Sequence, residues 1–432
     1  MKRQALTLFL LFCLVLTFVS MLEAAPPEQE KIVISFHNWM SAEKTSGGIS
    51  VLEAAEKKYE KLHPEIELDV VPLPYEETMS QLTVMTAAGK QPDVTLIDVG
   101  WLRAVAAMGG IEPLNDYISE ELKNDLLPAT WAEVTLGDTI WALPWNQNPN
   151  NIVYNRNLMK QAGLDPDKPP KNMDELNEAI AAISALGEDI YGIALDTSKW
   201  FLAADYLHPW LWNFGGKFLD ENGKPAFNNE AGVEMVKWLK GLVDKGYMKA
   251  GLNIRDLRVL FAQEKVGFIV EGPWIKGILQ GESGRGEEFD AVWDATFIPT
   301  GPGTAEHEHG FCNPSSHILV LSNKSPHKKE AFAFMEFLIS DKEIVDDYMA
   351  NTGLMPVRQS LLTDEYRKDP KVGPFVAQME YTRVPEGWGP KWDAAAETYM
   401  AAIQKILVED ADIQKTLDEA AEEIEWILEQ QE

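Results

Sequence analysis

Tryptophan residues beside turn-forming, amide and carboxyl side chains are the first feature of this sequence that could do chemistry. A sugar has an apolar C–H face and a rim of hydroxyl groups, so its site needs flat indole rings together with amide or carboxylate groups. Each of these Trp residues could instead pack in a core, because aromatic side chains also dominate core burial. Those at expected strand ends and loops, most of them beside Gly, Pro, Asn or Asp, are Trp39, Trp101, Trp145, Trp200, Trp274, Trp388 and Trp392.

Acidic residues offer a second chemistry, the hydrolysis of a glycosidic bond by two carboxyl groups. Asp98 with Glu43 or Glu271 would be the candidate pair. The chain has 68 Asp and Glu residues, so some pairing is inevitable and spacing in the sequence gives no distance. The sequence contains no Gly-x-Ser-x-Gly nucleophile elbow and no glycine-rich phosphate loop. We therefore expect a binding protein rather than an enzyme.

His307-Glu308-His309 could supply two ligands to a metal ion. Structural metal sites usually need four ligands, and no other His or Cys residues cluster in the sequence. A solvated loop is the simpler interpretation. We expect no metal site and no cofactor.

The N-terminus has the three-part plan of a secretory signal peptide. Met1-Lys2-Arg3 is followed by an apolar run from Leu6 to Val19 and by small residues at Ala24 and Ala25. The run is shorter than the roughly 20 apolar residues that span a bilayer. Cys13 lacks the preceding small residues of a lipid-modified cysteine. Residues 1–25 are expected to be removed, which would leave a protein exported across the cytoplasmic membrane to the periplasm.

The net charge of −30 restricts the partners of the chain. Such a surface repels nucleic acid and anionic lipid, and it disfavours a strongly anionic ligand, although a local pocket can differ from the average field. After removal of the signal, Cys312 is the single cysteine and cannot form an internal disulfide. Stability must therefore come from a buried core, for which a chain of this length allows two or three domains.

Apolar runs alternate with helical patterns in the first hundred residues. Strands are expected at 32–36, 66–71 and 94–97, and helices at 49–63 and 79–88. Buried strands joined by crossover helices form a parallel sheet, whose ligands bind beyond the carboxyl ends of the strands. His37, Asn38 and Trp39 follow the first strand, while Asp98 and Trp101 follow the third. Both groups are expected at that edge.

The Asn-rich stretch from Asn146 to Asn151 indicates a crossover between two domains. Asn222-Gly223 indicates a hairpin turn farther along the chain. Gly272-Pro273-Trp274 ends a strand-like run and precedes a helix. Further helices are expected at 172–186, 202–214, 230–245, 254–263, 328–339 and 393–428, and further strands at 266–270 and 317–321.

Several motifs in a fixed order resemble the sugar-binding type of family 1 extracellular solute-binding proteins of ATP-binding-cassette importers. Each motif is modest, but their succession covers nearly all of the chain after the signal peptide. They are Gln91 to Trp101, Gly109 to Leu114, Trp141 to Pro144, Val153-Tyr154-Asn155, Ala162-Gly163-Leu164, Met173 to Leu176, Phe261 to Trp274 and Gly353 to Arg358.

The resemblance implies an α/β, two-lobed periplasmic-binding-protein fold in which the ligand lies between the lobes. Each lobe would be discontinuous, with a central sheet flanked by helices. Residues 26–144 plus about 310–352 would form the N-terminal lobe, and residues 145–309 plus about 353–432 the C-terminal lobe. A sugar or oligosaccharide would be bound by domain closure and delivered to membrane permease subunits by a monomer.

The resemblance also implies a set of ligand-binding residues. Many sugar binders have an acidic or a single amide residue after the Leu-Pro, whereas this chain has several Asn residues, which leaves the identity of the sugar open. A glycerol phosphate is the alternative ligand, since Arg358 with Lys44 or Arg103 could supply positive charge. The expected site residues are Glu43, Asp98, Trp101, Asn146, Asn148, Trp200, Trp274, Gly310, Arg358, Trp388 and Trp392.

Overall fold

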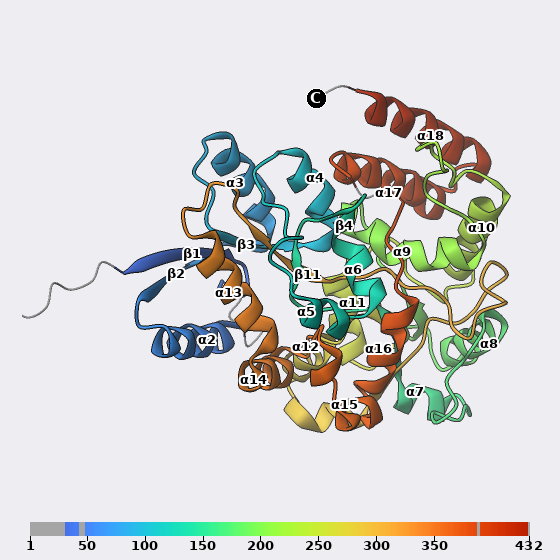
Figure 1. Ribbon diagram of the computed structural model, residues 1–432. Helices are drawn as coiled ribbons and strands as arrows, with labels where there is room; N and C mark the ends of the chain where they lie inside the picture. The colour runs from blue at the N-terminus through green and yellow to red at the C-terminus, as the bar shows by residue number, and fades with distance from the viewer. Residues whose placement is uncertain (1–30, 43–47, 387–388, 431–432) are drawn as a thin grey trace, which may run out of the picture.

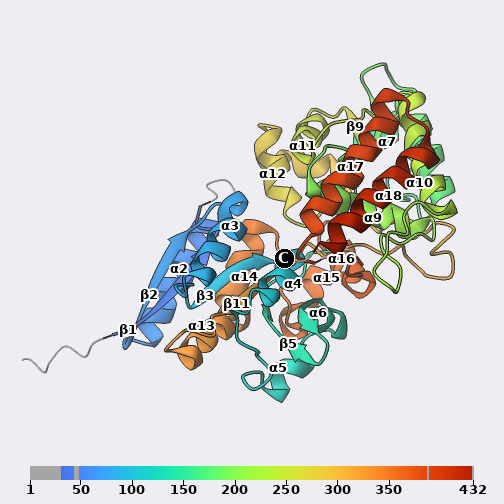
Figure 2. The ribbon, with the colours of Figure 1, turned by 90° about the horizontal axis from the view of Figure 1, so that it is seen from above.

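The computed structural model describes residues 31–42, 48–386 and 389–430 (Figure 1). Within these ranges the strands form a five-stranded sheet of order β2-β1-β3-β11-β6 and a four-stranded sheet of order β10-β7-β9-β8. A small third sheet pairs β4 (Thr135–Leu136) with β5 (Thr139–Ile140). The two larger sheets form the centres of the two parts of the molecule that Figure 2 shows side by side.

The five-stranded sheet begins with the predicted βαβαβ unit. Its parallel strands are β1 (Ile32–Asn38), β2 (Ile66–Pro72) and β3 (Val94–Asp98). The crossover helices α2 (Gly48–Leu62) and α3 (Tyr75–Ala87) connect them, which confirms the predicted order of elements. Alternating buried and exposed residues in β2 show that one of its faces packs on the core.

Two strands from later in the chain complete this sheet. β11 (His317–Leu321) runs antiparallel to β3, and β6 (Leu143–Pro144) runs antiparallel to β11. The sheet is therefore mixed, whereas the sequence pattern indicated a parallel sheet. Local periodicity reports the burial of a strand and not its direction, so it could not reveal these additions.

After β11 the chain stays with the first sheet. α13 (Lys328–Ser340) and α14 (Lys342–Thr352) both pack on α2, and both lie beside β1 to β3 in Figure 2. Lys58 of α2 bonds Asp341, which lies between the two returning helices, at 2.6 Å and Glu343, in the first turn of α14, at 2.7 Å. The part built around the five-stranded sheet is thus assembled from separate segments of the chain.

The four-stranded sheet consists of β7 (Asn151–Asn155), β8 (Tyr191–Ala194), β9 (Val266–Glu271) and β10 (Trp293–Thr296). β7 pairs antiparallel with β9 and β10, while β8 runs parallel to β9. Every residue of β7 and β9 is buried, which is usual for strands whose sheet is covered on both faces.

The helices expected at 172–186, 202–214, 230–245 and 254–263 match their sequence patterns within two residues at each end, and the range 393–428 forms two helices. α9 (Phe201–Asn213) packs against α17 (Trp392–Glu409), which also packs against α18 (Ile413–Glu429). Asn side chains cap the N-termini of α8 (Met173–Ser184), α10 (Glu230–Asp244) and α11 (Ile254–Ala262). The hairpin expected at Asn222-Gly223 is a short turn with one bridge between Leu219 and Pro225, in which Gly223 has φ of +76°.

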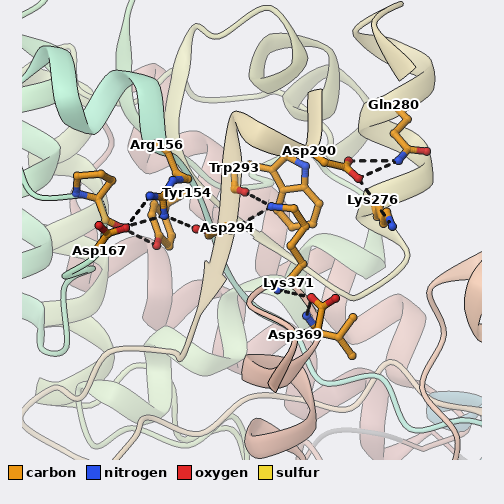
Figure 3. A network of polar contacts seen from close by, with 12 residues as sticks. Tyr154, Arg156, Asp167, Lys276, Gln280, Asp290, Trp293, Asp294, Asp369 and Lys371 are labelled. Atoms are coloured by element: carbon orange, nitrogen blue, oxygen red, sulfur yellow. Dashed lines mark hydrogen bonds and ion pairs between the residues drawn. The ribbon is translucent and has the colours of Figure 1, made fainter. Parts of the chain in front are cut away.

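The segment after α14 returns to the edge of the second sheet. Lys371 donates to the carbonyl oxygen of Trp293 at 2.5 Å and bonds Asp294 at 3.0 Å. Asp294 also accepts from Arg156, which bonds Asp167 at 2.6 Å (Figure 3). This network fastens the segment before α16 (Gly373–Gln378) to β10.

The remaining helices of the described residues are short. Among the described residues, no helix is both long and apolar enough to cross a membrane. Residues 1–25, for which a signal peptide is predicted, lie outside the described ranges. The other helices are α4 (Leu102–Ala107), α5 (Glu120–Asp125), α6 (Pro128–Val134), α7 (Arg156–Gln161), α12 (Ile275–Glu282), α15 (Asp364–Lys368) and the 3₁₀ helices η1 (Val99–Trp101), η2 (Gly286–Ala291), η3 (Gln359–Leu361) and η4 (Met379–Tyr381).

Candidate functional site

A cavity of about 250 Å³ is lined by residues from both parts of the molecule. The first part contributes the end of β1, the start of α3, the end of β3, the start of β11 and the end of α14. The second part contributes α9, α11, the turn from β9 into α12 and the first residues of α12. The lining residues are Trp39, Met40, Tyr75, Asp98, Ser315, His317, Asn351 and Thr352 from the first group of segments, Leu202, Tyr206, Arg258, Trp274, Gly277 and Ile278 from the second, and Leu354, which follows α14.

Asp98 is the acidic residue of the cavity wall. It ends β3, and its Oδ1 accepts a hydrogen bond from the N–H of Gly100 at 2.9 Å, which caps η1. Burial, assisted by the charge of Asp393, raises the pKa of Asp98 to about 7. The same carboxyl group therefore caps a turn and lines the cavity.

His317 lies directly opposite Asp98 in the antiparallel pair of β11 and β3. Its Nδ1 is 3.2 Å from Nδ2 of Asn146, and its ring meets Trp39 edge-on at 5.1 Å between centroids. Burial lowers the pKa of His317 to about 4, so the ring is neutral at ordinary pH. The cavity wall thus contains an acidic side chain, Asp98, and a neutral polar side chain, His317, on neighbouring strands.

Trp274 is held in place by Glu271, the last residue of β9. The indole Nε1 donates to Glu271 Oε2 at 2.9 Å. A side chain on Gly272 would place its Cβ 2.2 Å from Cη2 of Trp274, so the ring lies over the backbone of that glycine. Glycine at 272 and the buried carboxylate together fix the orientation of an indole that lines the cavity.

Aromatic side chains of the first part of the molecule form another section of the cavity wall. Tyr75 contacts Trp101 at 4.8 Å and Trp39 at 5.2 Å between ring centroids. Trp39 and Tyr75 line the cavity, whereas Trp101, which is 7% exposed, packs behind them. Aromatic faces of this kind suit the apolar face of a ligand.

Contacts at the edges of the cavity join the two parts of the molecule. Glu76, which follows Tyr75 in α3, forms an ion pair of 2.9 Å with Arg255 of α11. On another side, the end of α14 meets the turn before α12. Gly353 has φ of +73° there, and a Cβ at this position would lie 2.4 Å from the carbonyl oxygen of Pro273.

The cavity brings together only some of the residues expected from the sequence. Asp98 and Trp274 line it, and Trp101 supports its wall. Asn146 and Asn148 are fully buried beneath it and bond to each other rather than lining it. Glu43 and Trp388 lie outside the described residues.

Four other expected residues lie away from the cavity lining. Arg358 bonds Asp125 at 2.6 Å. Gly310 is buried, and its carbonyl oxygen accepts from Gln378 at 2.9 Å. Trp392 is 3% exposed and packs in the core, while Trp200 contacts Phe201 before α9. These positions reflect tertiary packing that sequence order alone does not reveal.

The structure adds lining residues that the sequence did not single out. Tyr206 lies in an aromatic-rich helix and Arg258 in an amphipathic one, and neither pattern tells which side chain meets a cavity. His317 begins a predicted strand, which was the available signal for it. The pairing of that strand with β3 brings His317 to the site.

Positive charge in the cavity is already balanced. Arg258 donates to Glu271 through Nε at 2.5 Å and Nη2 at 3.1 Å, and Glu271 has no exposed surface. Arg358 is paired with Asp125, Arg103 is exposed and outside the lining, and Lys44 is outside the described residues. Among the described residues, no group of three or more His, Cys, Asp or Glu side chains could hold a metal ion.

Comparisons with known proteins agree with this architecture. A family model described as bacterial extracellular solute-binding protein matches residues 41–344. A solute-binding protein of an ABC transporter from Thermotoga lettingae, solved with α-D-tagatose, has a TM-score of 0.77 at 22% identity, and the match covers 92% of this chain and 100% of the other. Such neighbours have two lobes, which confirms the predicted fold class.

Two relatives differ in the ligand that their names give. A maltotriose-binding protein of Pyrococcus abyssi is 24% identical over 399 residues, which cover 91% of this chain and 81% of the relative. An sn-glycerol-3-phosphate-binding periplasmic protein of Brucella melitensis is 27% identical over 328 residues, which cover 71% of this chain and 72% of the relative. The chemistry of the cavity has to distinguish these two classes of ligand.

Proposed function

Because this chain belongs to the bacterial extracellular solute-binding protein family, we propose that it binds a sugar or oligosaccharide and delivers it to the permease of an ATP-binding-cassette importer. The observation that carries the proposal is the lining of the cavity. Trp39, Tyr75 and Trp274 supply aromatic surface, while Asp98 and His317 supply polar groups at one place in the wall. This combination suits a ligand with apolar faces and a hydroxyl rim.

A glycerol phosphate suits the cavity less well. Its phosphate would meet the Asp98 carboxyl group, whereas the guanidinium of Arg258 is already engaged by both oxygens of Glu271. Sites for phosphate normally provide unpaired Arg or Lys donors. The balance of charge therefore supports a neutral sugar.

Closure of the two lobes around the ligand is the proposed mode of capture. A ligand that touches Asp98 and Trp274 at once contacts both parts of the molecule. Such contacts exist together only in a closed form, so the ligand shifts the population toward closure. We further propose export to the periplasm after removal of residues 1–25, and a monomeric state. We propose that one lobe comprises residues 26–144 plus about 310–352 and the other residues 145–309 plus about 353–432.

A thermal-shift screen tests this function. Monosaccharides, oligosaccharides of increasing length and glycerol phosphates are each added to the purified protein. A ligand at 100 times its Kd should stabilise the protein by about 2.7 kcal/mol. Stabilisation by sugars supports the proposal, whereas stabilisation only by phosphate compounds would replace it with the alternative ligand. Recovery of the bound oligosaccharide unchanged, checked by mass spectrometry, distinguishes binding from hydrolysis.

A further inference from the structure

The orientation of the Asn146 side chain is fixed by donors that cannot act as acceptors. The backbone N–H of His317 donates to Asn146 Oδ1 at 3.0 Å, and Asn148 Nδ2 donates to the same oxygen. A backbone N–H has no lone pair to offer, so this end of the amide must be the oxygen. The other end is the NH₂ group, and it lies 3.2 Å from Nδ1 of His317.

This arrangement determines which nitrogen of His317 carries the proton. An NH₂ group can only donate, so Nδ1 must accept and must be unprotonated. Since burial keeps the ring neutral, its single proton lies on Nε2. No protein acceptor for an Nε2–H is found in the described part of the chain, and His317 lines the cavity.

The protonated nitrogen belongs to a residue that lies beside Asp98. Directly opposite residues of antiparallel strands have side chains on the same face, about 4.5–5.5 Å apart at Cβ. His317 and Asp98 are such a pair, and both line the cavity. A hydrogen-bond donor and an acidic acceptor are therefore neighbours in the cavity wall.

We propose that Asn146 is a positioning residue, which holds His317 as the Nε2–H tautomer so that His317 and Asp98 form hydrogen bonds with two adjacent hydroxyl groups of a sugar. One hydroxyl donates to the Asp98 carboxylate, and its neighbour accepts from His317. Asn148 supports Asn146 in turn, because its own amide is held by the N–H of Met355 at 3.1 Å and the carbonyl oxygen of Ser315 at 3.2 Å. The Asn-rich stretch thus acts through His317. The nature of the ligand rests on the proposed function, whereas the tautomer does not.

Nitrogen NMR of the ligand-free protein tests the tautomer directly. Protein labelled with ¹⁵N in its His rings is measured at neutral pH, and the His317 signals are identified by their loss in His317→Gln. We expect a pyrrole-type signal for Nε2 and a pyridine-type signal for Nδ1. A proton on Nδ1 would overturn the proposal, whatever the protein binds.

Substitution of Asn146 tests the positioning role. In Asn146→Asp the carboxylate offers only acceptors, so His317 Nδ1 should acquire a proton and its signal should change to pyrrole type. Asn150→Asp is the matched control, because Asn150 is equally buried in the same stretch but bonds Asn313 and Ser315. Its His317 signals should remain those of the wild type. An unchanged Nδ1 signal in Asn146→Asp would contradict the role.

Calorimetry with maltotriose as the probe links the tautomer to binding. We expect Asn146→Asp to bind at least tenfold more weakly than Asn150→Asp. Equal affinities of the two variants would overturn the proposal that His317, held by Asn146, forms a hydrogen bond with a sugar hydroxyl group. Failure of every sugar in the screen to bind the wild-type protein would instead refute the proposed function, while the NMR result would still decide the tautomer.

Discussion

Arg258 and Glu271 form a two-point ion pair in the wall of the cavity, with Nε to Oε1 at 2.5 Å and Nη2 to Oε2 at 3.1 Å. Glu271 has no exposed surface, and its Oε2 also accepts from the indole of Trp274. One buried carboxylate therefore balances the charge of a cavity residue and orients an aromatic one. Loss of the Glu271 carboxylate would therefore affect both the charge of the cavity and the position of Trp274.

Replacing Glu271 by Gln should be strongly destabilising. The substitution leaves the Arg258 charge buried without its partner, and breaking such a pair typically costs about 3–5 kcal/mol. Glu264→Gln is the control, since Glu264 pairs with Arg285 at 2.7 Å in a more exposed setting and should cost about 0–1 kcal/mol. Chemical denaturation of both variants measures the difference. Equal costs would show that the Arg258 pair is not buried as described.

The same variant tests how the cavity selects against anions. If Glu271→Gln remains folded, the released guanidinium should allow glycerol 3-phosphate to bind more tightly than it binds the wild type. The gain should weaken as salt is added, because the attraction is electrostatic. Calorimetric titration at two salt concentrations measures both effects. Strong phosphate binding by the wild type would contradict the role given to the ion pair.

The elements of the fold were largely predictable from the sequence, because burial and helical periodicity are local properties. Strands β1, β2, β3 and β9 and helices α8, α10 and α11 lie close to their expected positions. The direction of β11 was not predictable, since it depends on pairing with β3, which lies far away in the sequence. Long-range pairing leaves little trace in the pattern of one strand.

The site was less predictable than the fold for the same reason. Asp98 and Trp274 follow strands, where ligand-facing residues gather, and both line the cavity. Arg358 also has a suitable side chain, but Asp125, more than two hundred residues earlier, engages it. Tyr206 reaches the cavity from within a helix in which nearly every residue is buried, so no amphipathic pattern distinguishes it.

Trp274→Ala should weaken binding while leaving the fold largely intact. The indole is partly exposed to the cavity, so its loss should lower sugar affinity at least tenfold, or about 1.4 kcal/mol. Trp392→Ala provides the contrast, because Trp392 packs on Phe218 and His208 in the core and should cost about 3–5 kcal/mol of stability. Thermal unfolding and calorimetry of both variants separate the effects. Unfolding of Trp274→Ala without a loss of affinity would assign this residue to the core.

Glu133 should make the protein less stable as pH rises. Burial raises its pKa from 4.5 to about 8, although Gln147 donates to it at 3.1 Å. Between these values the folded state holds a proton that the unfolded state releases, so stability falls with pH by up to about 1.4 kcal/mol per unit. Glu133→Gln should flatten this part of the curve. Chemical denaturation of both proteins from pH 5 to pH 8 measures the free energy of unfolding. The same pH dependence in the wild type and in Glu133→Gln would disprove the contribution of Glu133.

Asp98→Asn should separate a ligand-binding carboxylate from a simple helix cap. As a ligand group, ionised Asp98 accepts from sugar hydroxyls, and replacing one acceptor by a donor should lose about 1.5–3 kcal/mol, or roughly 10- to 150-fold in Kd. As a cap alone, Asn would accept from Gly100 almost as well, and both stability and affinity would be unchanged.

The pH dependence of binding gives a second measurement of the Asp98 role. The pKa of Asp98 is about 7 in the ligand-free protein, so below this pH its carboxyl group carries a proton and loses an acceptor. Wild-type affinity for the sugar should therefore rise as pH increases through 7, and the rise should be absent from Asp98→Asn. Calorimetric titrations of both proteins at pH 6 and pH 8 measure the difference. Identical pH profiles, or an unchanged Kd in the variant, would remove Asp98 from the ligand site.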